Sequence, residues 1–225
     1  CKMNAAAHEE WKPSRSPWYS AGAVMLTIFM VVLDSSIANV ALPNIAGSFS
    51  ATQDESTWVL TSYLVANGVI IPSIAWFSTL FGRKNFLLLS TILFTASSAL
   101  CGMASSMGML IFARVIQGLG GGAIMPIGQA VMMEEFPVEE RGVAMSVFGF
   151  GVIFAPIIGP TLGGWITDTY SWHWIFLINV PVGIIAVILG NLFIEDPPYA
   201  KKGKVQKVDY IGFILLIVWL FSLQV

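Results

Sequence analysis

The chain has 225 residues, of which 56% are hydrophobic and only 11% are charged. Soluble domains carry about 25% charged residues, and a soluble fold of this length has too small an interior to hide so much apolar surface. Lipid is therefore the expected solvent, which excludes a disulfide scaffold and a disordered tail. The formal net charge of −2 gives no basic surface for a phosphate backbone, so nucleic acid is excluded as a partner.

Apolar runs predict six complete membrane-spanning helices, because one such helix needs about 20 mainly apolar residues. The predicted helices cover 18–42, 57–80, 86–105, 107–130, 142–166 and 172–194. A further run is still apolar at Val225, so we expect the sequence to be the first part of a longer protein. The expected organisation is a tail, a six-span bundle, a linker and the start of a seventh span, at 1–17, 18–194, 195–208 and 209–225.

The positions of the basic residues predict the orientation of these helices. Ten of the 11 lysines and arginines lie in the tail, in the linker and in alternate connections, whereas the other connections, near 43–56, 105–107 and 167–171, contain none. The positive-inside rule then places the N-terminus and the linker in the cytoplasm. The four linker lysines are most simply an anchor on that side, with lipid binding as the alternative.

Two charged residues lie well inside the predicted helices, Asp34 in the first and Arg114 in the fourth. A charge there costs about 2.5–3.5 kcal/mol on insertion scales, which makes such residues functional candidates. At 1.5 Å per residue they lie about 12 Å and about 10 Å below the same outer surface. We expect either a proton or cation site, in which Asp34 titrates and Arg114 tunes it, or a static pair that orients two helices.

Uncharged polar side chains add to the same predicted helices. Asn39 in the first helix and Gln117 in the fourth are grouped with the two charges as candidate proton-coupling or substrate residues. Asn67 and Gln129 also lie in apolar stretches. For any single one of these amides, a hydrogen bond between helices is the simpler interpretation.

Glycine and proline recur at helical spacing in the fourth and fifth predicted helices. Small residues four positions apart allow close helix approach, and a proline removes a backbone hydrogen bond and favours a bend. The pattern therefore suggests a conformational role, with ordinary packing as the alternative. The candidate residues are Gly118, Gly120, Pro156, Gly159, Pro160, Gly163 and Gly164.

Enzyme motifs give no support for catalysis. Residues 118–123 formally match a dinucleotide-binding fingerprint, but they lie inside a predicted span with no strand before them. The sequence contains no GxxxxGK[ST], HExxH or GxSxG motif, and its two histidines, His8 and His173, lie far apart. We therefore expect a transporter rather than an enzyme, with no cofactor.

Four segments resemble one family in the correct order. LDSSIANVALP at 33–43 resembles the end of the first span of the 14-span drug:proton antiporters of the major facilitator superfamily, of the EmrB type. Residues 110–120 are similar to the fourth-span motif, whose arginine, here Arg114, is linked to proton transfer. Residues 159–164 resemble the fifth-span antiporter motif, and 172–183 resemble the entry of the sixth span.

One family motif is only partly present. The loop between the second and third spans keeps Gly82, Arg83 and Lys84, but Thr79 stands where the family has an acid and Leu80 where it has an arginine. The departure puts in doubt a charge latch at this loop. Arg83 is expected to engage either a helix C-terminus or a loop acid such as Glu139 or Glu140.

The resemblance implies an all-α integral membrane fold: the N-terminal six-helix bundle of a major facilitator, plus the start of a seventh helix. It implies export of amphiphilic drugs across a bacterial inner membrane, driven by a proton gradient, with a periplasmic adaptor and an outer-membrane channel as partners. Phe29, Met30 and Met125 are expected to line an apolar drug cavity. The alternatives are a truncated, non-transporting remnant or scaffold, and an exporter of a metabolite, lipid or siderophore.

Overall fold

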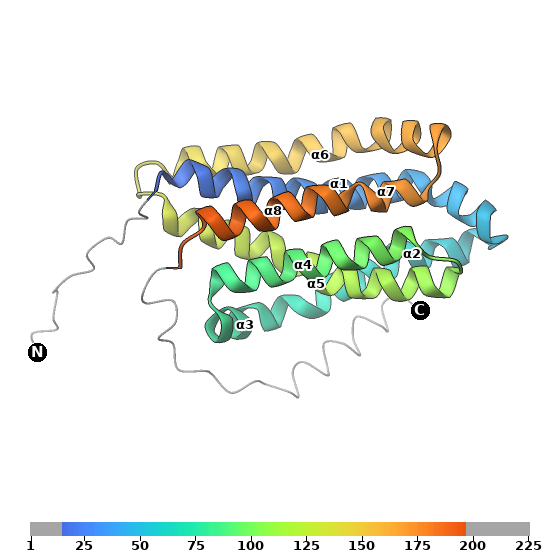
Figure 1. Ribbon diagram of the computed structural model, residues 1–225, viewed down its shortest axis with the longest axis horizontal. Coiled ribbons are helices and arrows are strands. Elements are labelled where there is room, and N and C mark those ends of the chain that lie inside the picture. Colours follow the sequence, from blue (N-terminus) through green and yellow to red (C-terminus); the bar gives the residue numbers. More distant parts are fainter. Residues whose placement is uncertain (1–14, 197–225) are drawn as a thin grey trace, which may run out of the picture.

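The computed structural model describes residues 15–196, which form helices and no strands (Figure 1). The elements are α1 (Pro17–Phe49), α2 (Gln53–Ile70), η1 (Ile71–Ser73), α3 (Ile74–Phe81), α4 (Arg83–Gly102), α5 (Met107–Glu135), α6 (Arg141–Thr169), α7 (His173–Leu177) and α8 (Asn179–Phe193). They make six helical stretches that are long and apolar enough to cross a membrane. The six predicted helices are confirmed, while the seventh run and all but the first two linker residues lie outside the described part of the chain.

Two of the six stretches are interrupted where proline removes a backbone donor. Pro72 lies in the 3-10 turn η1, which joins α2 to α3, and Pro181 follows the break between α7 and α8 at Ile178. A proline N cannot bond the carbonyl four residues earlier, and at these two positions the regular helix is interrupted. The second break places Asn179 at the start of α8, in the middle of the bundle.

Helix α1 is longer than its apolar run predicts. The run was expected to end at Leu42, but the helix continues through Pro43 to Phe49. Trp172 stabilises this extension: its Nε1 donates to Ser48 Oγ at 3.0 Å, and its ring lies 5.4 Å from that of Phe49. Trp172 itself is 4% exposed and packs inside the bundle.

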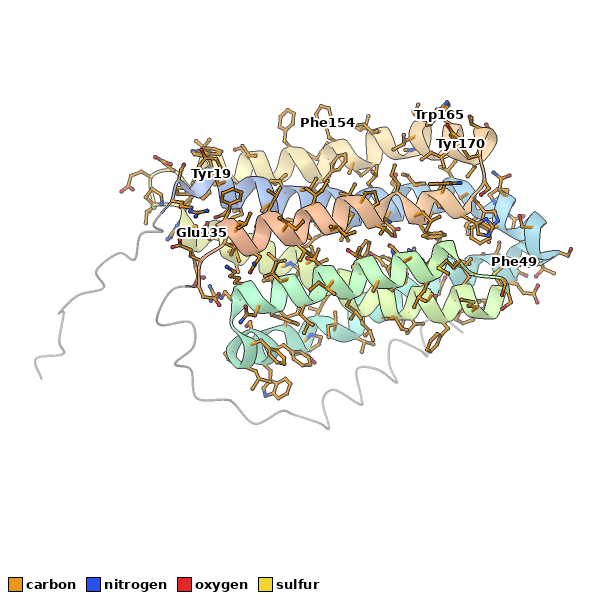
Figure 2. All side chains as sticks on the ribbon, in the orientation of Figure 1. Tyr19, Phe49, Glu135, Phe154, Trp165 and Tyr170 are labelled. Carbon is orange, nitrogen blue, oxygen red and sulfur yellow. The ribbon has the colours of Figure 1, made fainter. Side chains whose placement is uncertain are left out.

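Helix α5 packs mainly between α2 and α4, and α1 packs mainly against α6 and α8. Figure 1 shows α1, α6 and α8 in one layer and α4, α5 and α2 in the other. Most of α6 faces outward; Phe154 and Trp165 point away from the bundle in Figure 2. A large apolar face of α6 is therefore available to lipid or to further helices.

Glycines set the closest approaches of α5. A Cβ on Gly118 would lie 2.5 Å from the backbone oxygen of Tyr63 in α2, and one on Gly120 would lie 2.9 Å from the backbone nitrogen of Phe94 in α4. Backbone atoms cannot move aside as the end of a side chain can. The two glycines therefore fix the distances of α5 from its neighbours on both sides.

Candidate functional site

The two intramembrane charges meet in the middle of the bundle. Arg114 Nη1 donates to Asp34 Oδ2 at 2.6 Å, and both side chains are almost wholly buried, at 0% and 1% exposed. The expectation that Asp34 and Arg114 share a depth is confirmed. A pair removed from solvent in this way is stable only if other hydrogen bonds satisfy its remaining polar atoms.

Two amides complete the shell of Asp34. Gln117 Nε2 and Asn179 Nδ2 both donate to Asp34 Oδ1, at 3.1 Å and 2.7 Å. The same amide nitrogens also lie 2.6 Å and 3.3 Å from Ser98 Oγ. Ser98 thus links α4 to amides from α5 and α8, and the carboxylate has a donor at each oxygen.

Arg114 is held by several further contacts. Its Nε donates to the carbonyl of Val59 at 3.1 Å, and its Nη1 also donates to Gln117 Oε1 at 2.8 Å. The guanidinium carbon lies 4.2 Å from the centre of the Tyr63 ring and 5.5 Å from that of Phe176. With Asp34 on α1, the site is therefore shared by α1, α2, α4, α5, α7 and α8.

Asn39 does not belong to this network. Its side chain is exposed on α1 and makes no hydrogen bond to another side chain within residues 15–196. Asn39 follows Asp34 by five residues, which turns it about 140° around the helix axis. Conversely, the sequence reasoning missed Asn179, although an amide two residues before a proline in an apolar run was a signal that could have found it.

The glycines and prolines that recur at helical spacing in α6 face α1 over part of the length of α6. A Cβ on Gly159 would clash with Ser36 Oγ, and one on Gly163 would lie 2.9 Å from Ile37 Cγ2. Ser36 Oγ also donates to the carbonyl of Pro156 at 3.4 Å. Gly164 has no atom within 4 Å of its Cβ position among the described residues, so it is not part of this contact.

The partly preserved loop motif lies at the end of the bundle that carries Arg15, Arg83, Lys84 and Arg141, which we call the basic end. Gly82 has φ 82°, which side chains rarely adopt, and it lets the chain reverse between α3 and α4. The Lys84 backbone N–H donates to Asp196 Oδ1 at 2.8 Å, and Lys84 Nζ donates to the carbonyl of Asn191 at 2.7 Å.

Arg83 pairs with Glu134 at the end of α5. The loop acids Glu139 and Glu140, named as alternatives, are exposed and do not pair with Arg83. Arg83 therefore engages an acidic side chain in the last turn of α5 rather than either of the two loop acids.

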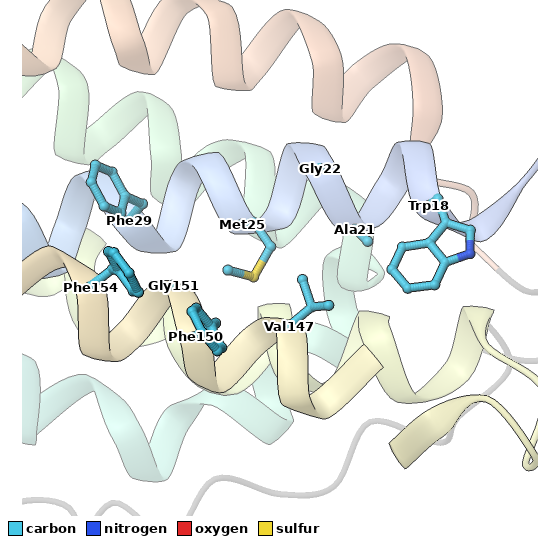
Figure 3. Close-up of a pocket in the computed structure, with 9 residues that line it drawn as sticks. All are labelled: Trp18, Ala21, Gly22, Met25, Phe29, Val147, Phe150, Gly151 and Phe154. Carbon is cyan, nitrogen blue, oxygen red and sulfur yellow. The ribbon is translucent and has the colours of Figure 1, made fainter. Parts of the chain in front are cut away.

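An apolar groove lies between α1 and α6 near the basic end (Figure 3). It has a volume of about 450 Å³ and includes Phe29, Met25, Phe150 and Phe154 in its lining. The prediction that Phe29 lines an apolar cavity is confirmed. The prediction for Met30 is wrong: one residue further along the helix, it is 1% exposed and packs in the core.

Met125 is half-buried and packs against that same core rather than in the groove. The groove residues are therefore contributed by α1 and α6 alone. No group of three or more His, Cys, Asp or Glu side chains suited to a metal ion occurs within residues 15–196.

Comparisons with known proteins agree with this architecture. The chain is 42% identical over 204 residues to the multidrug export protein EmrB of Haemophilus influenzae. The matched region covers 90% of this chain and 39% of that protein. It is 41% identical over 203 residues to EmrB of Escherichia coli K12, with coverage of 90% and 39%. The fatty acid resistance protein FarB of Neisseria gonorrhoeae is 36% identical over 199 residues, with coverage of 88% and 39%. The chain thus spans about two fifths of the length of these relatives.

Solved transporters share the fold at low sequence identity. The inward-open xylose transporter XylE of E. coli superposes with a TM-score of 0.74 at 15% identity, over 93% of this chain and 56% of that one. A bacterial homolog of the human lysosomal transporter Spinster gives 0.71 at 18% identity, over 82% and 46%. The sequence model of the Major Facilitator Superfamily matches residues 24–223. The chain therefore belongs to the major facilitator superfamily.

Proposed function

We propose that this chain is part of a proton-coupled exporter of amphiphilic compounds that works by alternating access in a bacterial inner membrane. The superfamily membership and the multidrug export relatives support the transport role. The buried Asp34–Arg114 pair supports the coupling to protons, and it is the single observation on which the proposal depends.

Asp34 is suited to couple a proton to a change of structure. Its carboxylate accepts from three side chains on two other helices, so those helices are held together through one negative charge. Protonation removes that charge and turns one oxygen from an acceptor into a donor. The network must then rearrange, which gives protonation a direct effect on how α1 sits against α5 and α8.

The burial of Asp34 favours a proton over a drug as its ligand. The carboxylate lies inside the six-helix unit, with its side chain 1% exposed. A proton can reach such a site along a short chain of water molecules, whereas a drug requires an open cavity. Amphiphilic compounds are better matched by the groove lined with Phe29, Phe150 and Phe154.

The contact between α1 and α6 would carry this rearrangement from α1 to α6. Gly159 and Gly163 let α6 pack directly on Ser36 and Ile37, within three residues of Asp34 on the same helix. Pro156 and Pro160 lie inside α6, where each removes one backbone hydrogen bond. Movement of α1 would therefore be transmitted to α6 and to the groove between them.

Energy would come from the proton gradient, without a bound cofactor. The positive-inside rule places the basic end, with Arg15, Arg83, Lys84 and Arg141, in the cytoplasm. A periplasmic adaptor and an outer-membrane channel are the partners we propose for an exporter of this type. The relative named for fatty acid resistance favours amphiphilic acids as a second class of cargo.

The test uses the full gene product that contains these residues, reconstituted in proteoliposomes with an imposed pH gradient. We expect wild-type protein to export ethidium or a fluorescent fatty acid, and we expect Asp34→Asn to abolish gradient-driven export when equal amounts of folded, reconstituted protein are compared. Asp168→Asn is the matched control, because Asp168 is an exposed residue at the end of α6. Gradient-driven export that survives in Asp34→Asn contradicts the assignment, and a wild-type protein that transports neither probe favours a non-transporting role.

A further inference from the structure

The hydrogen bonds of Arg114 leave part of its guanidinium unpaired. A guanidinium has five N–H donors. Here Nε and Nη1 are hydrogen-bonded, whereas Nη2 is buried and has no hydrogen-bond partner within the described residues. Since only one of these bonds goes to Asp34, the other contacts of Arg114 decide where the guanidinium goes when that carboxylate becomes neutral.

Two aromatic rings account for the remaining contacts. The Tyr63 ring lies 4.2 Å and the Phe176 ring 5.5 Å from the guanidinium carbon, within the distance of about 6 Å at which a cation is attracted to a ring face. Both residues are buried, at 2% and 0% exposed. The rings come from α2 and α7, so they approach the cation from elements other than α1.

The hydroxyl of Tyr63 lies near Asn67 and Ser35 without a hydrogen bond of normal geometry, whereas its ring contacts the Arg114 guanidinium. A buried tyrosine hydroxyl usually finds a hydrogen-bond partner, but that of Tyr63 has none of normal geometry among residues 15–196. Glycines on α5 also set the position of this residue. A Cβ on Gly118 would lie 2.5 Å from its backbone oxygen, and one on Gly121 would lie 2.8 Å from its hydroxyl.

We propose that Tyr63 and Phe176 form an aromatic clamp that holds the Arg114 guanidinium in place when Asp34 is protonated, so that Asp34 and α1 move while Arg114 stays. This inference deepens the proposed function and rests on it. Tyr63 and Phe176 are positioning residues: they act on the proton site through Arg114. The clamp keeps a fixed positive charge beside Asp34, ready to reform the pair when the proton leaves.

The contacts that remain after protonation do not depend on pH. Arg114 would keep the Val59 carbonyl, Gln117 Oε1 and the two rings, none of which ionises near neutral pH. The titratable side chains around the pair are Asp34 from α1, Tyr63 from α2 and Cys101 from α4, with Cys101 Sγ donating to Gln117 Oε1 at 3.6 Å. The described parts of α6, α7 and α8 bring no titratable side chain to the pair; α7 and α8 contribute Phe176 and Asn179.

The test measures the pH profile of gradient-driven export by the full gene product in proteoliposomes, with ethidium or a fluorescent fatty acid as the probe. Tyr63→Leu removes the ring and is expected to shift the profile by about one pH unit towards higher pH, because a guanidinium that leaves the site no longer favours the ionised carboxylate. Tyr63→Phe keeps the ring and is expected to retain the wild-type profile. Phe176→Leu, on a different element, is expected to give a smaller shift in the same direction.

Fluorinated phenylalanines at position 63 give a version of the test that preserves packing. Each added fluorine weakens the attraction of the ring face for a cation while the ring keeps nearly the same size. We expect the profile to move progressively to higher pH with fluorination, starting from Tyr63→Phe. A profile that stays constant across the fluorinated series, in a protein that still exports the probe, overturns the clamp but leaves the proposed function standing. Failure of the wild-type protein to export either probe overturns the proposed function instead.

Discussion

Helix α5 takes part in two ion pairs that differ in almost every physical respect. In its N-terminal half, Arg114 pairs with Asp34 where both side chains are almost wholly buried, at 0% and 1% exposed. In its last turn, Glu134 pairs with Arg83 where the side chains are 18% and 35% exposed. The buried pair is surrounded by amide donors and aromatic rings, whereas the pair at the basic end lies at the surface of the bundle.

The difference in burial gives the two pairs different roles. The buried pair can change how the helices are arranged, whereas the pair at the basic end mainly stabilises the contact between α4 and α5. A buried pair loses much solvation, so removing one partner leaves an uncompensated charge in a medium that cannot stabilise it. An exposed pair is screened by water and salt, and breaking it changes little. The same helix can therefore respond strongly to a change of charge at the buried pair and weakly to a change at its C-terminal end.

The largest expected effect follows from removing the buried cation. Arg114→Met leaves Asp34 buried without its counter-ion, which we expect to lower the free energy of unfolding by about 3–5 kcal/mol. Thermal unfolding in detergent at neutral pH would measure the loss.

The control for this prediction is the double variant Asp34→Asn with Arg114→Met, in which neither charge remains. It is expected to recover most of the lost stability, because no uncompensated charge is buried. Equal destabilisation in the single and double variants would show that the packing of Arg114, rather than its charge, holds the site together.

A smaller effect is expected where α5 is fitted against α2. Gly118→Ala places a methyl group 2.5 Å from the backbone oxygen of Tyr63, and overpacking of this kind costs about 1–3 kcal/mol. Gly164→Ala is the matched control, since its Cβ would meet no described atom within 4 Å. Thermal unfolding of the two variants side by side gives the comparison, and a Gly118→Ala protein as stable as Gly164→Ala would contradict the close approach of α5 to Tyr63.

The smallest effect is expected at the basic end. Arg83→Gln breaks the pair with Glu134 and should cost about 0.2–1 kcal/mol, as partly exposed pairs do. The difference from wild type should shrink further when the salt concentration is raised, because salt screens exposed charges. A loss comparable to that of Arg114→Met, or one insensitive to salt, would remove the distinction between the two pairs.

Much of this arrangement could be predicted from the sequence, because it depends on distance along one helix. The apolar runs gave the six helices, and the rise per residue placed Asp34 and Arg114 at one depth. Gln117 follows Arg114 by three residues and so lies on the same face of α5. Periodicity also shows why Asn39 and Met30 were misplaced, since each is turned away from the residue with which it was grouped.

The rest of the site depends on how separate helices pack, which no single-helix pattern reveals. Ser98, Tyr63 and Phe176 reach the pair only because α2, α4 and α7 surround it. The choice of Glu134 over the loop acids for Arg83 likewise follows from the position of the last turn of α5 beside α4. A proline in an apolar run indicates a bend, so the sequence can suggest the helix breaks near Pro72 and Pro181. The hydrogen bond between Asn179 and Asp34 depends on the packing of α8 against α1, which the sequence pattern does not show.

The most direct test of the central claim is to count the protons released when the full gene product binds its exported probe in weakly buffered detergent solution. If binding of the probe in the groove expels the proton from Asp34, the wild-type protein releases protons when the probe binds, and Asp34→Asn releases close to none at equal occupancy of the probe. Undiminished proton release from Asp34→Asn would contradict the claim that Asp34 carries the coupling proton.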